Sequence, residues 1–184
     1  MIDIEKLTQA ELDRADQEHH TPTAGAMISH VVANLWLHQL KIEQATLFVK
    51  KCGVSLFLTQ AGPEWQAKEA DFIHRLNQAL ADEGDLVPTT SHQILEYTML
   101  KESLGNKFKP ARDQLFDLIQ DFDTQLMFIT RAIELAQKEH HYAQAALLVE
   151  LYGWQKAQIR RGQTILGHNV NEGLASAEED DDED

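Results

Sequence analysis

An evenly spaced stripe of apolar residues in the second half of the chain constrains the fold more than any other feature. The stripe follows Lys109-Pro110, and its members recur at intervals of three or four residues. They are Leu115, Ile119, Phe122, Leu126, Ile129, Ile133 and Ala136. This heptad-like spacing puts them all on one face of an α-helix, and that face needs partner helices to cover it. The stripe therefore predicts a long helix packed in a bundle.

Two other segments have helical periodicity and predict the first and last long helices. From Ala24 to about Cys52 the apolar residues cover a broad arc, which indicates a helix that faces more than one partner. They are Ile28, Val31, Val32, Leu35, Trp36, Leu40, Ile42, Ala45 and Val49. The last helix is expected after His140-His141 and should end at Gly167. Its apolar members are Leu148, Leu151, Tyr152, Ile159 and Leu166.

The remaining long helix is expected to begin at residues 59–62. Proline tolerates the first turn of a helix and acids favour the positive end of the helix dipole, so Pro63-Glu64 indicates a helix start. The apolar residues Val54 to Leu58 would then form a connection before it, and Gly84 would end it. Its core candidates are Ala67, Phe72, Leu76, Ala79 and Leu80. A short helix capped by Ser91 is expected over Ser91–Leu100, in the crossover that follows.

The net charge of −14 is concentrated at the two ends of the 184-residue chain. Residues 1–20 contribute −4, the seven acids Glu178–Asp184 contribute −7, and residues 21–176 contribute only −3. We therefore expect a mobile acidic N-terminal arm over residues 1–20, one helical domain over residues 21–170 and a disordered acidic tail over residues 171–184.

Several classes of protein are excluded by what the sequence lacks. No run approaches the roughly 18 apolar residues of a membrane span, and the N-terminus does not have the pattern of a secretory signal. A single cysteine, Cys52, excludes an intrachain disulfide. No glycine-rich phosphate loop, nucleophile elbow or Glu-x-x-His pair occurs. We expect a cytoplasmic protein with no membrane partner.

Three motifs link the helices to a known family. They are the turn Glu83-Gly84-Asp85-Leu86-Val87-Pro88-Thr89-Thr90, the run Phe116-Asp117-Leu118-Ile119-Gln120-Asp121-Phe122, and Leu147-Leu148-Val149-Glu150. With them the chain resembles, from about Ala24 to Gly167, the Dps branch of the ferritin superfamily, mini-ferritins that protect DNA from oxidative damage. The resemblance implies an all-α, ferritin-like four-helix bundle with a short helix in the long crossover between helices 2 and 3. It also implies a shell of twelve chains.

The resemblance further implies an iron-oxidising site between two subunits. In the family a His is followed after 12, 16, 27 and 31 residues by His, Asp, Asp and Glu, and the matching positions here are Thr46, Leu58, Gly62, Ile73 and Asn77. Counting backwards from the turn at residue 84 gives the same register. None of these side chains supplies the carboxylate or imidazole that iron oxidation needs. We therefore expect no conventional ferroxidase centre, no resident cofactor and no enzyme activity.

Iron remains the expected metal if the family activity is retained. A shifted register would then bring Glu43, Glu64, Asp71 or His74 into play.

Three other sets of side chains are weaker candidates for metal binding. Asp16 and His19, and likewise Asp71 and His74, are three residues apart, so each pair shares a helix face. Glu139, His140 and His141 precede the last helix, where the resemblance implies a three-fold pore. A ring of His141 side chains there would bind a softer metal or respond to pH. For each set, a solvated or structural role is the alternative.

His30 and His38 are two turns apart on one helix, too far to share an ion, and structural or surface roles are expected for them.

The partners follow from charge and from the resemblance. Strong DNA binding is not expected, because both ends are acidic and no lysine-rich arm is present. Divalent ions that bridge acidic surface to phosphate remain a weaker route. The expected partner is another copy of the chain, or an active relative in a mixed shell.

Three functions are consistent with these features. We favour a noncatalytic shell or partner subunit of stress protection and iron homeostasis. The first alternative is an iron-oxidising, iron-storing mini-ferritin with displaced ligands. The second is a small-ligand or regulatory bundle with a dry pocket near Leu58, Phe72 and Ile73.

Overall fold

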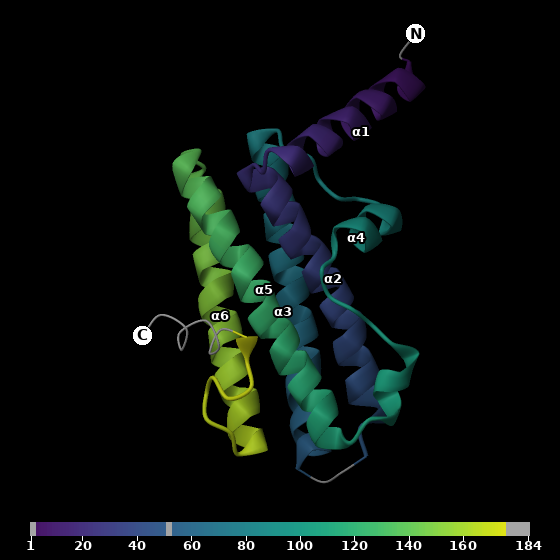
Figure 1. Cartoon of the computed structure of the whole chain (residues 1–184), viewed down its shortest axis with the longest axis vertical. Coiled ribbons are helices and arrows are strands. Elements are labelled where there is room, and N and C mark those ends of the chain that lie inside the picture. The colour runs from purple at the N-terminus through teal and green to yellow at the C-terminus, as the bar shows by residue number, and fades with distance from the viewer. Residues whose placement is uncertain (1–2, 51–52, 176–184) are drawn as a thin grey trace.

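In the described part of the chain, four long helices run side by side as a bundle (Figure 1). The computed structural model describes residues 3–50 and 53–175, except the side chain of His19. The long helices are α2 (Ala24–Phe48), α3 (Val54–Glu83), α5 (Ala111–Lys138) and α6 (Tyr142–Leu166). The crossover from α3 to α5 contains the short helix α4 (Ser91–Tyr97) and the 3₁₀ helix η1 (Leu104–Phe108). The predicted all-α bundle, with a short helix between its second and third long helices, is confirmed.

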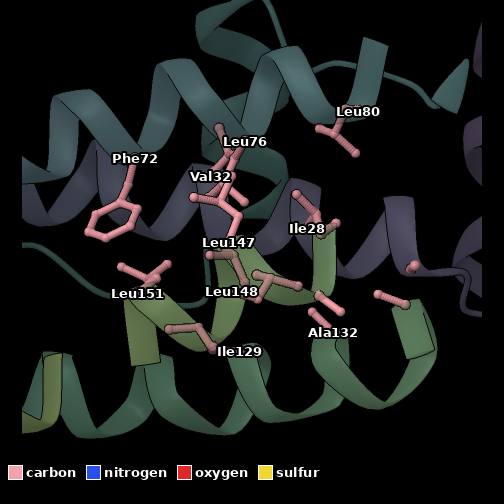
Figure 2. Close-up of a cluster of buried hydrophobic side chains, with 14 of the residues drawn as sticks. Ile28, Val32, Phe72, Leu76, Leu80, Ile129, Ala132, Leu147, Leu148 and Leu151 are labelled. Atoms are coloured by element: carbon pink, nitrogen blue, oxygen red, sulfur yellow. The ribbon is translucent and has the colours of Figure 1, made fainter. Parts of the chain in front are cut away.

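The bundle core consists of two apolar clusters, and every long helix contributes to both. The upper cluster lies at the end where α2 begins (Figure 2). Its fully buried members include one or more from each long helix, for example Ile28, Leu76, Ile129 and Leu148. The corresponding members of the lower cluster are Ile42, Leu58, Leu115 and Ile159. Each such side chain stabilises the fold by roughly 1.5–3 kcal/mol, so the predicted stripe on α5 joins two separate cores.

Helix α3 begins earlier than the sequence predicts. It starts at Val54 and contains Pro63 in its interior, so the expected apolar connection is the first turn of the helix. Proline in a helix interior costs about 3 kcal/mol, but a continuous helix buries Val54, Leu58 and Trp65 against the lower cluster. Burial of these side chains offsets the cost. Ala67, expected in the core, is instead exposed.

Glycine ends α3 and α6 as the sequence predicts, whereas α2 and α4 are shorter than predicted, with α4 ending at Tyr97 rather than Leu100. Gly84 and Gly167 end α3 and α6 in the left-handed conformation, with φ of 75° and 73°. Helix α2 ends at Phe48 rather than near Cys52, because Val49 is already extended. The cap of α4 is Thr90, not Ser91, since the Thr90 side chain accepts from the Gln93 amide.

The segments outside the bundle are helical or packed where they are described. Helix α1 (Ile4–His20) projects from the top of the bundle (Figure 1). Arg14 holds its base by donating to the Gly84 carbonyl at 3.1 Å. At the other end of the chain, Leu174 is buried in the lower cluster, so core packing extends past residue 170. The acidic residues Glu178–Asp184 lie outside the described residues.

None of the helices in the described part of the chain has the length and apolar character needed to cross a lipid bilayer.

Candidate functional site

Helices α2 and α3 make a close contact at Gly62, one of the positions where the family resemblance implies an iron ligand. A Cβ atom added to Gly62 would lie 2.3 Å from Thr46 Oγ1 and 3.5 Å from Ile42 Cγ2. Carbon atoms do not approach an oxygen so closely, so glycine is what lets these helices meet here. Leu58, one turn earlier on α3, is fully buried in the lower cluster. Helix packing therefore fills this half of the expected site.

The other two positions lie further along α3. Ile73 is 5% exposed and belongs to the upper cluster. Asn77 is half-buried one turn later and lines a surface groove. Its Oδ1 atom is buried and, within the described residues, has no hydrogen-bond partner.

These five residues do not fit iron. Their only side-chain oxygens belong to Thr46 and Asn77, and both are neutral, whereas ferrous iron in an oxidising site is held by carboxylates and imidazoles. A carboxylate at position 62 would collide with Thr46. In the described ranges, no group of three or more His, Cys, Asp and Glu side chains is arranged to hold a metal ion.

The residues of a shifted register are engaged elsewhere or exposed. Glu43 accepts from Gln66 at 2.9 Å, and Glu64 pairs with Arg161 at 3.0 Å. Asp71 joins a surface network in which Arg75 lies 3.2 Å away, and His74 is exposed. Neighbouring helices therefore do not bring these side chains together as a ligand set.

Glu139, at the turn before α6, makes a structural contact with the start of α2. Its carboxylate accepts from the Ala24 amide at 3.0 and 3.1 Å, which places a negative charge at the N-terminus of α2. His141 lies 3.7 Å from Glu83 and bonds Gln144 at 3.2 Å. His140 has a positive φ of 65° and its ring contacts the Tyr142 hydroxyl at 3.0 Å. These three side chains thus have polar contacts within a single chain.

Of the two N-terminal candidates, the structure describes the side chain of Asp16 alone. Asp16 is exposed, and its backbone carbonyl lies 2.8 Å from the ring of His20. The side chain of His19 lies outside the described residues.

A large apolar groove borders the bundle between α2 and the crossover. It has a volume of about 640 Å³ and is lined by residues of α2, of α4 and of the turn before α4, with Asn77 at one side. Trp36 and Leu40, which belong to its lining, are 45% and 61% exposed. Leu95 from α4 is 63% exposed. The broad apolar arc predicted for the first helix thus has one face in the core and one face in this groove.

A buried pair of ionisable side chains that the sequence did not predict lies in the middle of the bundle. His38 on α2 and Glu69 on α3 are both fully buried, and His38 Nδ1 lies 2.6 Å from Glu69 Oε1. Burial raises the pKa of Glu69. Burial acts to lower the pKa of His38, but the adjacent Glu69 carboxylate outweighs it and raises that pKa.

Helical phase was the available signal for this pair. His38 follows the buried Leu35 by three residues and precedes the buried Ile42 by four, so it continues the core stripe of its helix. Its Nε2 atom and Glu69 Oε2 have no hydrogen-bond partner among the described residues. The alternative role expected for His38, at the surface, is wrong. His30 is half-buried, with its ring 2.7 Å from the Tyr97 carbonyl.

Solved structures similar to this chain are Dps proteins. DpsB of Lactococcus lactis MG1363 has 37% sequence identity and a TM-score of 0.85, over 91% of this chain and 96% of that chain. DpsA of the same strain has 31% identity and a TM-score of 0.85, over 92% and 99%. Dps from Listeria monocytogenes has 19% identity and a TM-score of 0.77, over 82% and 97%. The last similarity concerns the fold alone.

No protein-family model matches the chain, and no curated protein sequence matches it.

Proposed function

The chain belongs to the Dps family of the ferritin superfamily, and from this membership we propose that it is a noncatalytic subunit of a Dps-like shell. It would serve stress protection and iron homeostasis through assembly rather than through iron oxidation. The observation that carries the proposal is the contact between Gly62 and Thr46, 2.3 Å from an added Cβ atom to Thr46 Oγ1. This contact leaves no room for a carboxylate at a position where the family resemblance implies one.

Apolar packing supports the loss of catalysis at the neighbouring positions. Leu58 and Ile73 are buried in the lower and upper clusters. A cluster of polar ligands in the same place would carry a desolvation cost that these side chains avoid. The region contributes to folding as an ordinary part of the core.

The exposed groove supports assembly with a second copy of the chain. Trp36 and Leu40 line the groove and are exposed to solvent, so they offer an apolar surface beside a cavity. A patch of this kind is suited to a two-fold interface, in which identical surfaces meet. Large aromatic side chains are the usual anchors of such interfaces. A mixed shell with an active relative would use the same surface.

Charge argues against strong DNA binding by such a shell. Residues 1–20 carry six acids against Lys6 and Arg14, and residues 4–20 form α1, which projects from the bundle. Duplex DNA repels an acidic arm because affinity arises from cations that neutralise phosphates. Divalent ions would be needed to bridge this helix to DNA.

Ferrous loading under anaerobic conditions, followed by air, tests the proposal. We expect no oxygen consumption above that of buffer and fewer than about one iron bound per chain, since the family positions supply no anionic ligand. A catalytically active Dps protein is the positive control. Prompt oxygen consumption with several irons per chain would overturn the proposal.

Variants distinguish the displaced-ligand alternative if oxidation is found. The triple substitution Glu43→Gln, Asp71→Asn and His74→Gln changes exposed residues only. It would abolish oxidation if these side chains bind iron, and it would leave the bundle intact.

The small-ligand alternative is not supported by the packing. Phe72 and Ile73 belong to the upper cluster and Leu58 to the lower one, so their own neighbours fill the region where a dry pocket was expected.

A further inference from the structure

A closed ring of polar contacts lies inside the bundle and joins each long helix to two neighbours. His38–Glu69 joins α2 to α3 at 2.6 Å, and Trp65–Gln158 joins α3 to α6 at 2.9 Å. Gln155–Gln125 joins α6 to α5 at 3.2 Å, and Asp121–Lys41 joins α5 back to α2 at 2.5 Å. We refer to these eight residues as the central polar ring.

The central polar ring lies at the level where the two apolar clusters meet. On α2, His38 falls between Leu35 of the upper cluster and Ile42 of the lower cluster. On α3, Glu69 falls between Trp65 of the lower cluster and Phe72 of the upper cluster. The ring is shut off from solvent, because none of its side chains is more than 12% exposed. An uncompensated charge in the ring therefore costs far more free energy than one at the surface.

The charges of the ring balance only when His38 and Glu69 share one proton. Lys41 and Asp121 neutralise each other at 2.5 Å. With one proton, the His38–Glu69 pair is also neutral overall, whereas loss of that proton would leave an uncompensated carboxylate in the core. The other charged groups that act on the pair are Asp121 from α5 and Lys41 from α2. From α6, the neutral amides of Gln155 and Gln158 belong to the ring, and Arg161 donates to Gln158 Oε1 at 2.7 Å.

We propose that the central polar ring links folding of the bundle to the binding of one proton. At neutral pH the folded chain keeps this proton on the His38–Glu69 pair, whereas the unfolded chain has released it. The ring then acts as a pH-sensitive element that favours the closed bundle at neutral and mildly acidic pH. Alkaline conditions remove the proton and weaken the contact between α2 and α3.

The direction of the pH dependence follows from the raised pKa values of both members of the pair. An unfolded histidine has a pKa of about 6.5, so below that pH the unfolded chain also holds the proton and the pair adds no slope. Above it, the folded chain holds one proton more. The contribution of the pair to stability is therefore fully present below about pH 6.5. At higher pH the folding constant falls by up to about tenfold per pH unit, until the folded pair itself loses its proton.

Denaturant unfolding of the full chain between pH 6 and pH 8.5 tests the proposal. Wild type should lose stability as the pH rises. The double variant His38→Gln with Glu69→Gln retains hydrogen-bonding groups but has no proton to exchange, so its profile should lose this slope. His92→Gln is the matched control, because His92 is 90% exposed, and it should keep the slope. An unchanged slope in the double variant would overturn the proposal.

A second measurement needs only wild type and the control, in case the double variant does not fold. Calorimetric unfolding at pH 7.5, in buffers with different enthalpies of ionisation, counts the protons exchanged. We expect release of about one proton per chain, as the linkage relation requires. Unfolding without proton release would contradict the linkage.

Discussion

The space between α2 and α3 contains two regions built in opposite ways. At Thr46 and Gly62 the helices touch directly, and the atoms nearest to a Cβ added at Gly62 belong to Thr46 and Ile42. Eight residues earlier on α2, about 12 Å away along a helix, His38 and Glu69 place a charged pair at full burial. The family resemblance implies ionisable metal ligands at the first region, yet the structure has a fully buried pair of ionisable side chains at the second. Membership of a family therefore does not fix where a chain keeps its buried charges.

The two regions also differ in what they contribute to stability. Leu58, next to Gly62, gains the roughly 1.5–3 kcal/mol of a buried aliphatic side chain. A buried ion pair contributes much less, because removing two charges from water costs about as much as their attraction returns. A single substitution that removes one partner, however, leaves the other charge buried without compensation. The polar region is therefore the more sensitive of the two to single substitutions.

The largest effect should come from breaking the buried pair. Glu69→Ala or His38→Ala leaves one polar group unpaired in the core and should lower the free energy of unfolding by about 3–5 kcal/mol. His38→Leu combined with Glu69→Met removes both charges and should recover most of that loss. Urea unfolding measures all three variants. Equal losses in the single and double variants would show that packing, not charge balance, governs this region.

The next effect concerns the groove beside the two regions. Trp36→Ser removes a large exposed aromatic side chain and should weaken association of chains by about 2 kcal/mol or more. The free energy of unfolding of one chain should change little, since Trp36 is 45% exposed. Light scattering after size-exclusion chromatography gives the mass, and Leu12→Ser on α1 is a matched exposed control. Assembly unaffected by Trp36→Ser would remove the groove from the interface.

A smaller loss of stability is expected from a substitution at Gly62, where α2 and α3 are in direct contact. Gly62→Ala places a methyl group against Thr46 and should destabilise the bundle by about 1–3 kcal/mol. Thr46→Ala in the same chain removes the colliding oxygen, and the double variant should regain at least the loss, because alanine favours a helix over glycine by about 1 kcal/mol. The double-mutant cycle is read from thermal unfolding. Additive changes would mean that the two residues are not in contact.

The smallest effect is expected from a charged pair at the surface. Arg75 and Glu150 join α3 to α6 at 2.5 Å, but their side chains are 38% and 45% exposed. Removing both should cost less than about 1 kcal/mol, because solvent and salt screen such pairs.

The surface pair should also respond to pH in the direction opposite to the buried one. Hydrogen bonding to Arg75 lowers the pKa of Glu150 to about 2. Its contribution is therefore present above the usual pKa of a glutamate and is lost as the pH falls toward 2. Comparison of acid unfolding between wild type and Glu150→Gln checks this sign. A loss on raising the pH instead would contradict it.

The bundle itself was predictable because its signals are local. The stripe from Leu115 to Ala136 predicts α5, and glycine at positions 84 and 167 predicts the ends of α3 and α6, where only the left-handed backbone allows the turn. The start of α3 was not predictable from Pro63, because burial of Val54 and Trp65 by distant helices outweighs a local rule. Thr90 replaces Ser91 as the cap of α4, since neighbouring residues compete for the same role.

The candidate site was predictable only in part. The prediction that Thr46 and Gly62 stand at iron-ligand positions of the family stays a prediction. The direct contact between these two residues could not be predicted, because it depends on the helix separation. His38 and Glu69 are 31 residues apart in sequence, and nothing local indicates that they meet. Their phase on the core stripes predicts burial, whereas pairing depends on the register of two helices.

The most direct test of the central claim is to locate iron in crystals of this protein loaded anaerobically with ferrous iron. Anomalous scattering at the iron absorption edge would show whether any iron lies beside Thr46, Gly62 or Asn77. We predict no anomalous peak there, with the side chains of α2 and α3 in contact. Iron bound by carboxylates or imidazoles between two chains at that place would contradict the account.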